Sequence, residues 1–330
     1  MHHTKIEFPR VLKKIAAEWF LIGLVLALGA AWMFPAPGSD GGILRPESAT
    51  KLAVFLIFLS SGLTLPIASI LPGLSAWRLH LYVQTFIFIG APVIFFAVVT
   101  LLGGSLDPGL RLGFWFLAIL PCTISTAVVM STSAGGDAAA ALFNVTIANL
   151  LGVIVVPAIS AQLVGDRAGS VDGITMIGHT ATMILPPLML GIFIRPFASD
   201  WFGRRKKWFG TLSSALILFI CYVSFAQSFT NQTWTRLGGS QIGLTIGLSA
   251  SLVILLMATT AALLRACRFE RPLAVSGFFC SSQKTLAAGV PMALAIFTPI
   301  GLDTSLILTP LLCFYALSLA VSGIVVRWLH

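Results

Sequence analysis

Long uninterrupted runs of apolar residues are the feature that most restricts how this chain of 330 residues can fold. Hydrophobic residues make up 57% of it and charged residues only 9%, whereas soluble domains carry about 25% charged residues. So few charges cannot cover a surface that faces water. The runs are longer than strands and do not alternate polar with apolar residues, which argues against a β-barrel. The sequence therefore predicts an all-α polytopic membrane protein.

Ten segments are apolar over about 20 residues, the length that crosses the hydrocarbon layer of a bilayer. The predicted spans are residues 18–35, 49–71, 76–102, 109–133, 138–163, 173–195, 208–229, 240–264, 273–296 and 303–327. Ten spans divide into five and five, and an odd number in each half inverts the second half relative to the first. We therefore predict two inverted five-helix repeats, residues 18–163 and 173–327.

The distribution of positive charge predicts the orientation in the membrane. If the N-terminus lies inside, few of the 20 Lys and Arg residues fall outside; these are Arg45, Lys51, Arg111, Arg167 and Arg236. Cytoplasmic loops collect Lys and Arg, so we expect a multi-pass protein of the inner (plasma) membrane with both termini in the cytoplasm. This bias also accounts for the net charge of +9 without a nucleic-acid partner.

Residues 1–17 are basic and partly apolar, which is typical of a signal peptide or of a cytoplasmic lead-in that lies on the membrane. We favour the lead-in, because nine further spans follow the first one. The five cysteines form neither a disulfide framework nor a CxxC metal pair, and the sequence contains no GxxxxGK[ST] phosphate-binding loop. We therefore expect a protein that is not an enzyme and needs no cofactor.

The fourth span of each half is interrupted by polar residues. In span four, Pro121 removes a backbone donor, and Ser125 and Thr126 follow it. Span nine contains a run of small or polar residues that cannot face lipid, which is Cys280, Ser281, Ser282, Gln283, Lys284 and Thr285. Transporters with inverted repeats bind substrate and ions where such discontinuous helices meet, so the matched breaks predict a binding site at mid-membrane.

Lys284 is the one basic residue that this orientation assigns to neither side of the membrane, and no acidic residue lies clearly within any span. A charge at the bilayer centre costs roughly 2.5–3.5 kcal/mol on insertion scales, so Lys284 should face a cavity or a partner. Three roles remain open. It balances an anionic substrate, it holds the carbonyl ends of the broken helices in place of a bound cation, or it carries protons.

Further polar side chains of neighbouring spans lie at levels from which they could reach the same site. They are Asn144, Thr146 and Asn149 in span five, His80 and Gln84 in span three, and His179 and Thr182 in span six. Each of them alone could equally form a hydrogen bond to a neighbouring helix and have no role in binding. Asp137 stands at the start of span five, where an acidic residue is an ordinary N-cap.

At these residues the sequence resembles the bile acid:sodium symporter family, in its SBF-like branch. The matching stretches are FLSSGLTL (58–65), LPCTIST (120–126), AGGD (134–137), FNVT (143–146), NLLG (149–152) and FCSSQKTL (279–286). Their order and the number of spans agree along nearly the whole chain.

The resemblance implies a panel made of spans one, two, six and seven and a six-helix core in which unwound spans four and nine cross. It also implies a sodium site at the crossing and an organic anion in the cleft between panel and core. Four residues match sodium-site positions of the symporters: Gln84, Ser125, Thr126 and Gln283.

Two departures from the symporters put sodium binding in doubt. The symporters have a glutamate four residues before the span-nine glutamine and an asparagine after it, where this chain has Phe279 and Lys284. A cation 4 Å from an ammonium is repelled by roughly 4 kcal/mol at an effective dielectric of 20. Our hypothesis is that Lys284 occupies the place of the ion.

The sequence therefore predicts a secondary transporter that moves a small amphipathic organic anion by alternating access. One alternative is a sodium-coupled, bile-acid-like symporter, and another is a regulatory membrane protein that transports nothing. The predicted substrate- or ion-binding residues are Gln84, Ser125, Thr126, Asn144, Thr146, Asn149, Ser281, Ser282, Gln283, Lys284 and Thr285.

Overall fold

The computed structural model of the protein describes residues 19–65, 75–164 and 173–329, so the predicted lead-in and Arg167 lie outside the described residues. Within these ranges the chain forms helices and no strand. The α-helices are α2 (Trp19–Met33), α3 (Pro46–Thr64), α4 (Trp77–Thr85), α5 (Ala91–Leu102), α6 (Pro108–Ile119), α7 (Ile124–Ser133), α8 (Ala138–Val164), α9 (Gly173–Ile194), α10 (Ser199–Thr230), α11 (Thr233–Ala266), α12 (Arg271–Ser282), α13 (Leu286–Phe297) and α14 (Thr304–Leu329). Short helical turns are η1 (Ala36–Gly38), η4 (Phe86–Gly90), η6 (Arg195–Ala198) and η7 (Thr298–Ile300).

The all-α prediction is confirmed, and in the described residues each of the ten predicted segments overlaps one helix or consecutive helices. Six helical stretches of the described chain are long and apolar enough to cross a membrane, and a seventh is the bent pair of α6 and α7. Helix α2 is apolar but shorter. The protein is therefore a multi-pass membrane protein. The grouping of its helices into ten inverted spans stays a prediction.

Two features of the helices differ from the predicted spans. Helix α10 begins at Ser199, nine residues before the expected start, so the basic run at residues 204–207 is helical. Span three contains a π-helical turn, η4, in which the amide of Ala91 donates to the carbonyl of Phe86, five residues back. Pro92 follows at once and has no amide to donate, so an ordinary helical ladder cannot be completed at this point.

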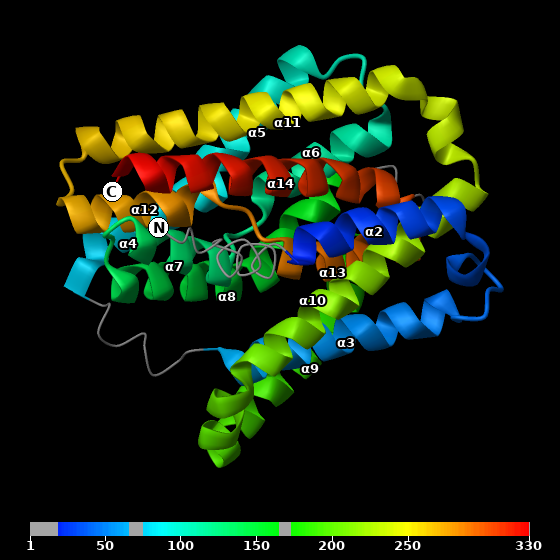
Figure 1. The fold of residues 1–330 in the computed structure, drawn as a ribbon, viewed down its shortest axis with the longest axis horizontal. Helices are drawn as coiled ribbons and strands as arrows, with labels where there is room; N and C mark the ends of the chain where they lie inside the picture. The colour runs from blue at the N-terminus through cyan, green and yellow to red at the C-terminus, as the bar shows by residue number, and fades with distance from the viewer. Residues whose placement is uncertain (1–18, 66–74, 165–172, 330) are drawn as a thin grey trace, which may run out of the picture.

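Helices α3 and α9 approach closely through two glycines. A Cβ on Gly62 would meet the backbone of α9, and a Cβ on Gly191 would meet the backbone of α3. Small residues let membrane helices pack backbone to backbone, where dispersion contacts replace a hydrophobic driving force. Helix α10 packs on α3 and on α2, so these four helices form one group along the lower right of Figure 1.

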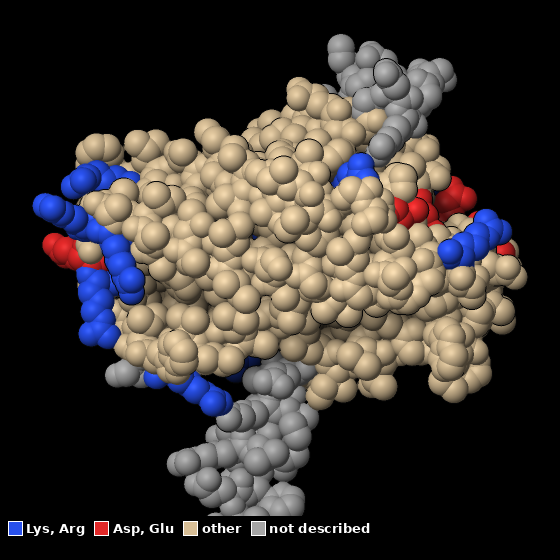
Figure 2. All heavy atoms as spheres, turned by 90° about the horizontal axis from the view of Figure 1, so that it is seen from above, with Lys and Arg blue, Asp and Glu red and all other residues tan. Residues whose placement is uncertain are grey.

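The remaining helices form a second group, in which α14 packs against α6 and α11, and α7 and α12 lie against α8. Helix α13 touches α3, α9 and α10 of the first group as well as α14 of its own. On the face shown in Figure 2, most charged side chains lie toward the two ends of the long axis, and a broad uncharged band separates them. That band is what a bilayer requires of a protein that spans it.

Candidate substrate and ion site

Two helix interruptions meet in the middle of the second group. Helix α6 ends at Ile119 and α7 begins at Ile124, with a bend of 57° between them. Leu120 is extended there, with φ −67° and ψ 142°, as the residue before a proline prefers. Helix α12 ends at Ser282 and α13 begins at Leu286, and the backbone between them is also extended. Both predicted breaks are therefore present.

The two extended segments hydrogen-bond to each other. The Thr285 amide donates to the Pro121 carbonyl at 2.8 Å. In the other direction, the Thr123 hydroxyl donates to the Lys284 carbonyl, also at 2.8 Å. Asn149 of α8 donates its side-chain amide to the Cys122 carbonyl at 2.8 Å. Groups that a broken helix would leave unpaired are thus satisfied across the crossing, which lets two interruptions exist inside an apolar layer.

Lys284 is the most unusual side chain of the crossing, because only 1% of it is exposed. Its Nζ donates to the carbonyls of Ala118 at 2.7 Å and Leu120 at 2.8 Å, at the C-terminal end of α6. That end of a helix carries unpaired carbonyls and the negative pole of the helix dipole. The Phe95 ring lies 5.8 Å from Nζ, within the range of a cation–π contact.

No carboxylate of the described residues lies within 4.0 Å of the Lys284 amine, so backbone carbonyls and an aromatic face supply its polar surroundings. Phe279, where the symporters have a glutamate, is fully buried and packs edge-on against Phe278. Of the three roles open at the sequence level, this geometry fits the one in which the amine holds carbonyl ends of a broken helix.

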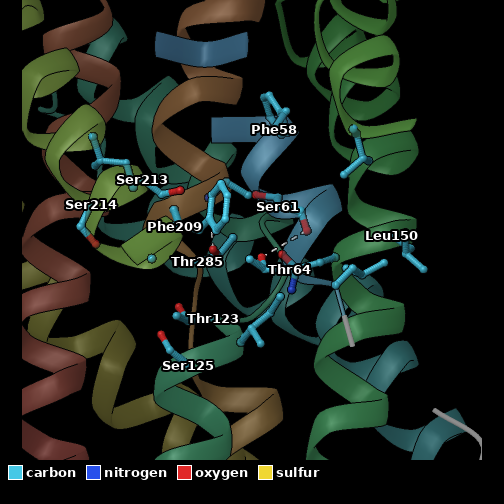
Figure 3. A pocket seen from close by; sticks show the side chains of 18 of the residues that line it. Phe58, Ser61, Thr64, Thr123, Ser125, Leu150, Phe209, Ser213, Ser214 and Thr285 are labelled. Carbon is cyan, nitrogen blue, oxygen red and sulfur yellow. Dashed lines mark hydrogen bonds between the residues drawn. The ribbon is translucent and has the colours of Figure 1, made fainter. Parts of the chain in front are cut away.

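A cavity of about 480 Å³ lies next to the crossing, between the two groups of helices. Helices α3, α9 and α10 form one wall, and α7, α8, α13 and the segment before α7 form the other. Figure 3 shows hydroxyl groups entering it from both sides. The polar lining residues are Ser61, Thr64, Thr123, Ser125, Asn149, Ser213, Ser214 and Thr285. Among the described residues, no Asp, Glu, Lys, Arg or His lines the cavity.

The structure divides the predicted site residues among different positions. Ser125, Asn149 and Thr285 line the cavity. Thr126 lies beside the Tyr315 hydroxyl, and the Gln283 amide donates to Ser322 at 2.6 Å.

A second set of predicted residues lies away from the cavity lining. Gln84 donates to the carbonyl of Asn144 at 3.1 Å. The hydroxyls of Thr146 and Ser282 bond to carbonyls four residues back in their own helices. Ser281 is fully buried.

Four further residues are named from the sequence, and the structure describes the side chains of three of them. Asp137 caps α8 through the Ala140 amide, as predicted. His80 stacks on Phe143 with ring centres 4.0 Å apart. Thr182 lies in a groove of the first group, between α3 and α9, and the His179 side chain is not among those described. None of the three lines the cavity.

The predicted set omits five hydroxyl-bearing residues of the cavity wall, which are Ser61, Thr64, Thr123, Ser213 and Ser214. The first three stand in stretches that carry the family resemblance, so motif position was a usable signal. For the part of the cavity wall that α10 provides, the only sequence signal was the Ser213–Ser214 pair in an apolar span. Such a pair serves helix–helix packing equally well, so by itself it does not indicate a binding site.

Sequence comparison identifies the family of this protein. The SBF-like CPA transporter family matches residues 18–330. The chain belongs to this family. It is 31% identical over 321 residues to "Sodium/bile acid cotransporter 7" of Rattus norvegicus, covering 96% of this chain and 94% of the rat protein. The mouse protein of the same name is 32% identical over 321 residues, with the same coverage. "Sodium/bile acid cotransporter 7-A" of Xenopus laevis is 31% identical over 326 residues, covering 96% and 92%.

Membership of the SBF-like CPA transporter family, together with the apolar helices, makes this chain a membrane transporter and not an enzyme. The resemblance found in the motifs is thereby confirmed. The family match also extends beyond those motifs, because it begins at the first predicted span and continues to the last residue.

Proposed function

We propose that the chain is a secondary carrier that moves a small amphipathic organic anion across the inner membrane by alternating access. Helices α2, α3, α9 and α10 form the panel, and the other helices form the core. In this proposal ten spans form two inverted repeats and both termini are cytoplasmic. The support is the position of the cavity, which lies between the two groups and reaches the residues where both core helices are interrupted.

The chemistry of the cavity suits an amphipathic ligand. Apolar side chains such as Phe58, Leu150 and Met292 provide most of the wall, and hydroxyls provide hydrogen bonds. Helix α7 begins at the cavity, and the Thr123 side chain makes no capping hydrogen bond there. Because a helix N-terminus attracts negative charge, the anionic end of the ligand would lie at the start of α7, although no cation among the described residues lines the wall.

The observation that carries the sodium-independent part of the proposal is the amine of Lys284, which is bonded to two backbone carbonyls and does not line the cavity. A bound cation would be coordinated by such oxygens. We infer that the lysine provides a permanent positive charge at the crossing, so that transport proceeds without sodium. The substrate then experiences that charge through the crossing and not by direct contact.

A sodium-coupled symporter is the alternative with a specific observation in its favour. The relatives are named as sodium cotransporters. In the described part of the chain, Gln84 Oε1, Gln283 Oε1 and Ser281 Oγ are buried without a hydrogen-bond partner. Oxygen atoms of this kind suit a hard cation. In that case an ion would bind through amide and hydroxyl oxygens, without the carboxylate that Phe279 replaces.

Uptake by purified protein in liposomes tests both functions. Radiolabelled taurocholate, a bile-acid anion, is the first probe, with sodium or choline as the only external cation. We expect uptake to be equal in the two salts and to be lost in Lys284→Ala but not in Lys51→Ala, which removes an exposed lysine. Uptake that requires sodium would favour the symporter.

Binding of the same probe separates a carrier from a protein that transports nothing. Ser125→Trp fills the cavity, whereas Ser251→Trp adds the same side chain on an exposed face of α11. We expect only the first variant to abolish the stabilisation of the protein by taurocholate and related amphipathic anions. If no such anion binds or is taken up, the protein is not the carrier proposed here, and a regulatory role becomes the better interpretation.

A further inference from the structure

The first turns of α10 combine exposed cations with exposed tryptophans. Arg204, Arg205 and Lys207 are exposed within four residues of one helix. Trp201 is 47% exposed and Trp208 is 60% exposed. Side chains of this kind gather where a membrane-spanning helix leaves the hydrocarbon, because the indole ring is amphipathic and lipid headgroups carry phosphate.

This basic segment lies at the edge of two apolar stretches. The span of α9 and η6 ends at Phe197, and the span of α10 begins at Lys207. Figure 1 shows this end of α9 and α10 protruding from the rest of the molecule. Phe193 and Phe197 are 70% and 79% exposed on the approach to it. The segment therefore combines apolar side chains for acyl chains with cations at the headgroup level.

The described side chains do not neutralise these cations. The guanidinium of Arg205 lies 4.3 Å from the centre of the Trp201 ring, a cation–π contact that orients it without using its N–H donors. Among described side chains, no carboxylate lies within 4.0 Å of Arg204, Arg205 or Lys207. Guanidinium groups pair with phosphate through parallel N–H donors.

We propose that the start of α10 is a binding site for an anionic phospholipid. Arg204, Arg205 and Lys207 bind the phosphate, and Trp201 and Trp208 lie at the level of the glycerol and the upper acyl chains. A lipid fits better than a soluble anion, because apolar rings surround the cations and both adjoining helices enter the hydrocarbon.

The proposed lipid site adjoins the cavity. Phe209 is buried and lines the cavity wall, while its ring packs edge-on against Trp208 at 5.2 Å and Trp201 at 6.2 Å. A lipid held by Arg205 therefore contacts the aromatic cluster that supports this wall. The binding itself does not depend on what the cavity carries.

Native mass spectrometry of the detergent-purified protein tests the site, with phosphatidylglycerol and phosphatidylcholine as probes. The test variant is R204Q/R205Q. The control R78Q/R265Q removes two other exposed arginines, and therefore the same charge. One cation near an anionic lipid surface contributes about a fivefold factor in binding. We expect wild type and control to retain phosphatidylglycerol, and the test variant to bind it at least tenfold more weakly.

Three outcomes would overturn the proposal. They are equal binding of the two lipids by wild type, an equal loss in the control pair, and unchanged binding in R204Q/R205Q. Thiol labelling of the buried cysteines on heating checks that each variant is folded. If the double variant unfolds early, the single variant Lys207→Gln replaces it and should weaken binding about fivefold.

Discussion

The two helix interruptions that meet at the crossing have different causes. Between α6 and α7, Pro121 imposes the break locally, because it lacks an amide and forces Leu120 into an extended conformation. Between α12 and α13, no proline stands at residues 283–285, and every residue there has an amide that a continuous helix could use. What keeps that segment extended is its contact with the first break.

Most hydrogen bonds between the two breaks have their donor in the second break and their acceptor in the first. The Thr285 amide and the Lys284 amine donate to carbonyls that lie at or before Pro121, and only the Thr123 hydroxyl donates the other way. The break at Pro121, which we call the proline break, therefore has a local cause and leaves backbone carbonyls without helical donors. The break at residues 283–285, the lysine break, depends on tertiary contacts, because its donors bond to those carbonyls. Changes at the two positions should accordingly differ in size.

The largest effect is expected for Lys284→Met. The substitution keeps an unbranched side chain but leaves the carbonyls of Ala118 and Leu120 without their donor, and each lost bond to a charged group contributes about 1.5–3 kcal/mol. Removing a buried charge offsets part of this loss. We expect a net destabilisation of about 2–4 kcal/mol. Thermal unfolding in detergent, followed by labelling of the buried Cys122, Cys221 and Cys280, measures it.

Lys51→Met is the matched control, because that lysine is exposed on α3. Its unfolding transition should remain near that of wild type. If Lys284→Met unfolds at the same temperature as this control, the amine does not hold the two breaks together.

A smaller effect is expected for Gly152→Ala, which acts on the proline break from α8. A Cβ at this position would lie 2.8 Å from Cγ and 3.1 Å from Cδ of Pro121, whose ring cannot move aside by changing rotamer. Overpacking of this kind costs about 1–3 kcal/mol. The same labelling assay should show a lower transition temperature.

Gly243→Ala is the control for Gly152→Ala. A Cβ there meets nothing within 4 Å, on an exposed face of α11. In a helix interior, alanine is about 0.5–1 kcal/mol better than glycine, so this variant should be neutral or slightly more stable. Equal transitions in the two alanine variants would show that Pro121 yields to the added methyl group.

The smallest effect is expected for Pro121→Ala. The carbonyl that accepts from Thr285 remains at residue 121, and the extended backbone is also held by Asn149 and Thr123. The main loss is the restriction that proline places on the unfolded chain, about 0.4–1 kcal/mol. A destabilisation in the labelling assay larger than that of Lys284→Met would reverse the comparison between the breaks.

Most of the fold followed from local patterns. Apolar runs located the helices, because a backbone in lipid must satisfy its own hydrogen bonds. The breaks followed from Pro121 and from the polar run at residues 280–285. The π-helical turn at Phe86–Gly90 and the helical start of α10 at Ser199 were missed. Both lie where the local sequence permits more than one conformation, so packing decides between them.

The site was less predictable than the fold. A sequence pattern can show that a side chain must avoid lipid, but not which buried surface it faces. Ser282 and Thr146 bond within their own helices, whereas Ser213 and Ser214, which the sequence analysis passed over, line the cavity. All four are hydroxyl-bearing residues in apolar helices. Only the packing of α3, α9 and α10 against the core determines which of them line the cavity.

The amino-acid sequence by itself determined that this is a membrane protein. It also determined which residues form the helices and at which residues two of the helices are broken. These properties depend on solvation and backbone chemistry within a few turns of helix. Only the tertiary structure decided where the amine of Lys284 goes, since its acceptors, Ala118 and Leu120, lie more than 160 residues earlier in the chain. That choice depends on how the helices pack, which no local pattern contains.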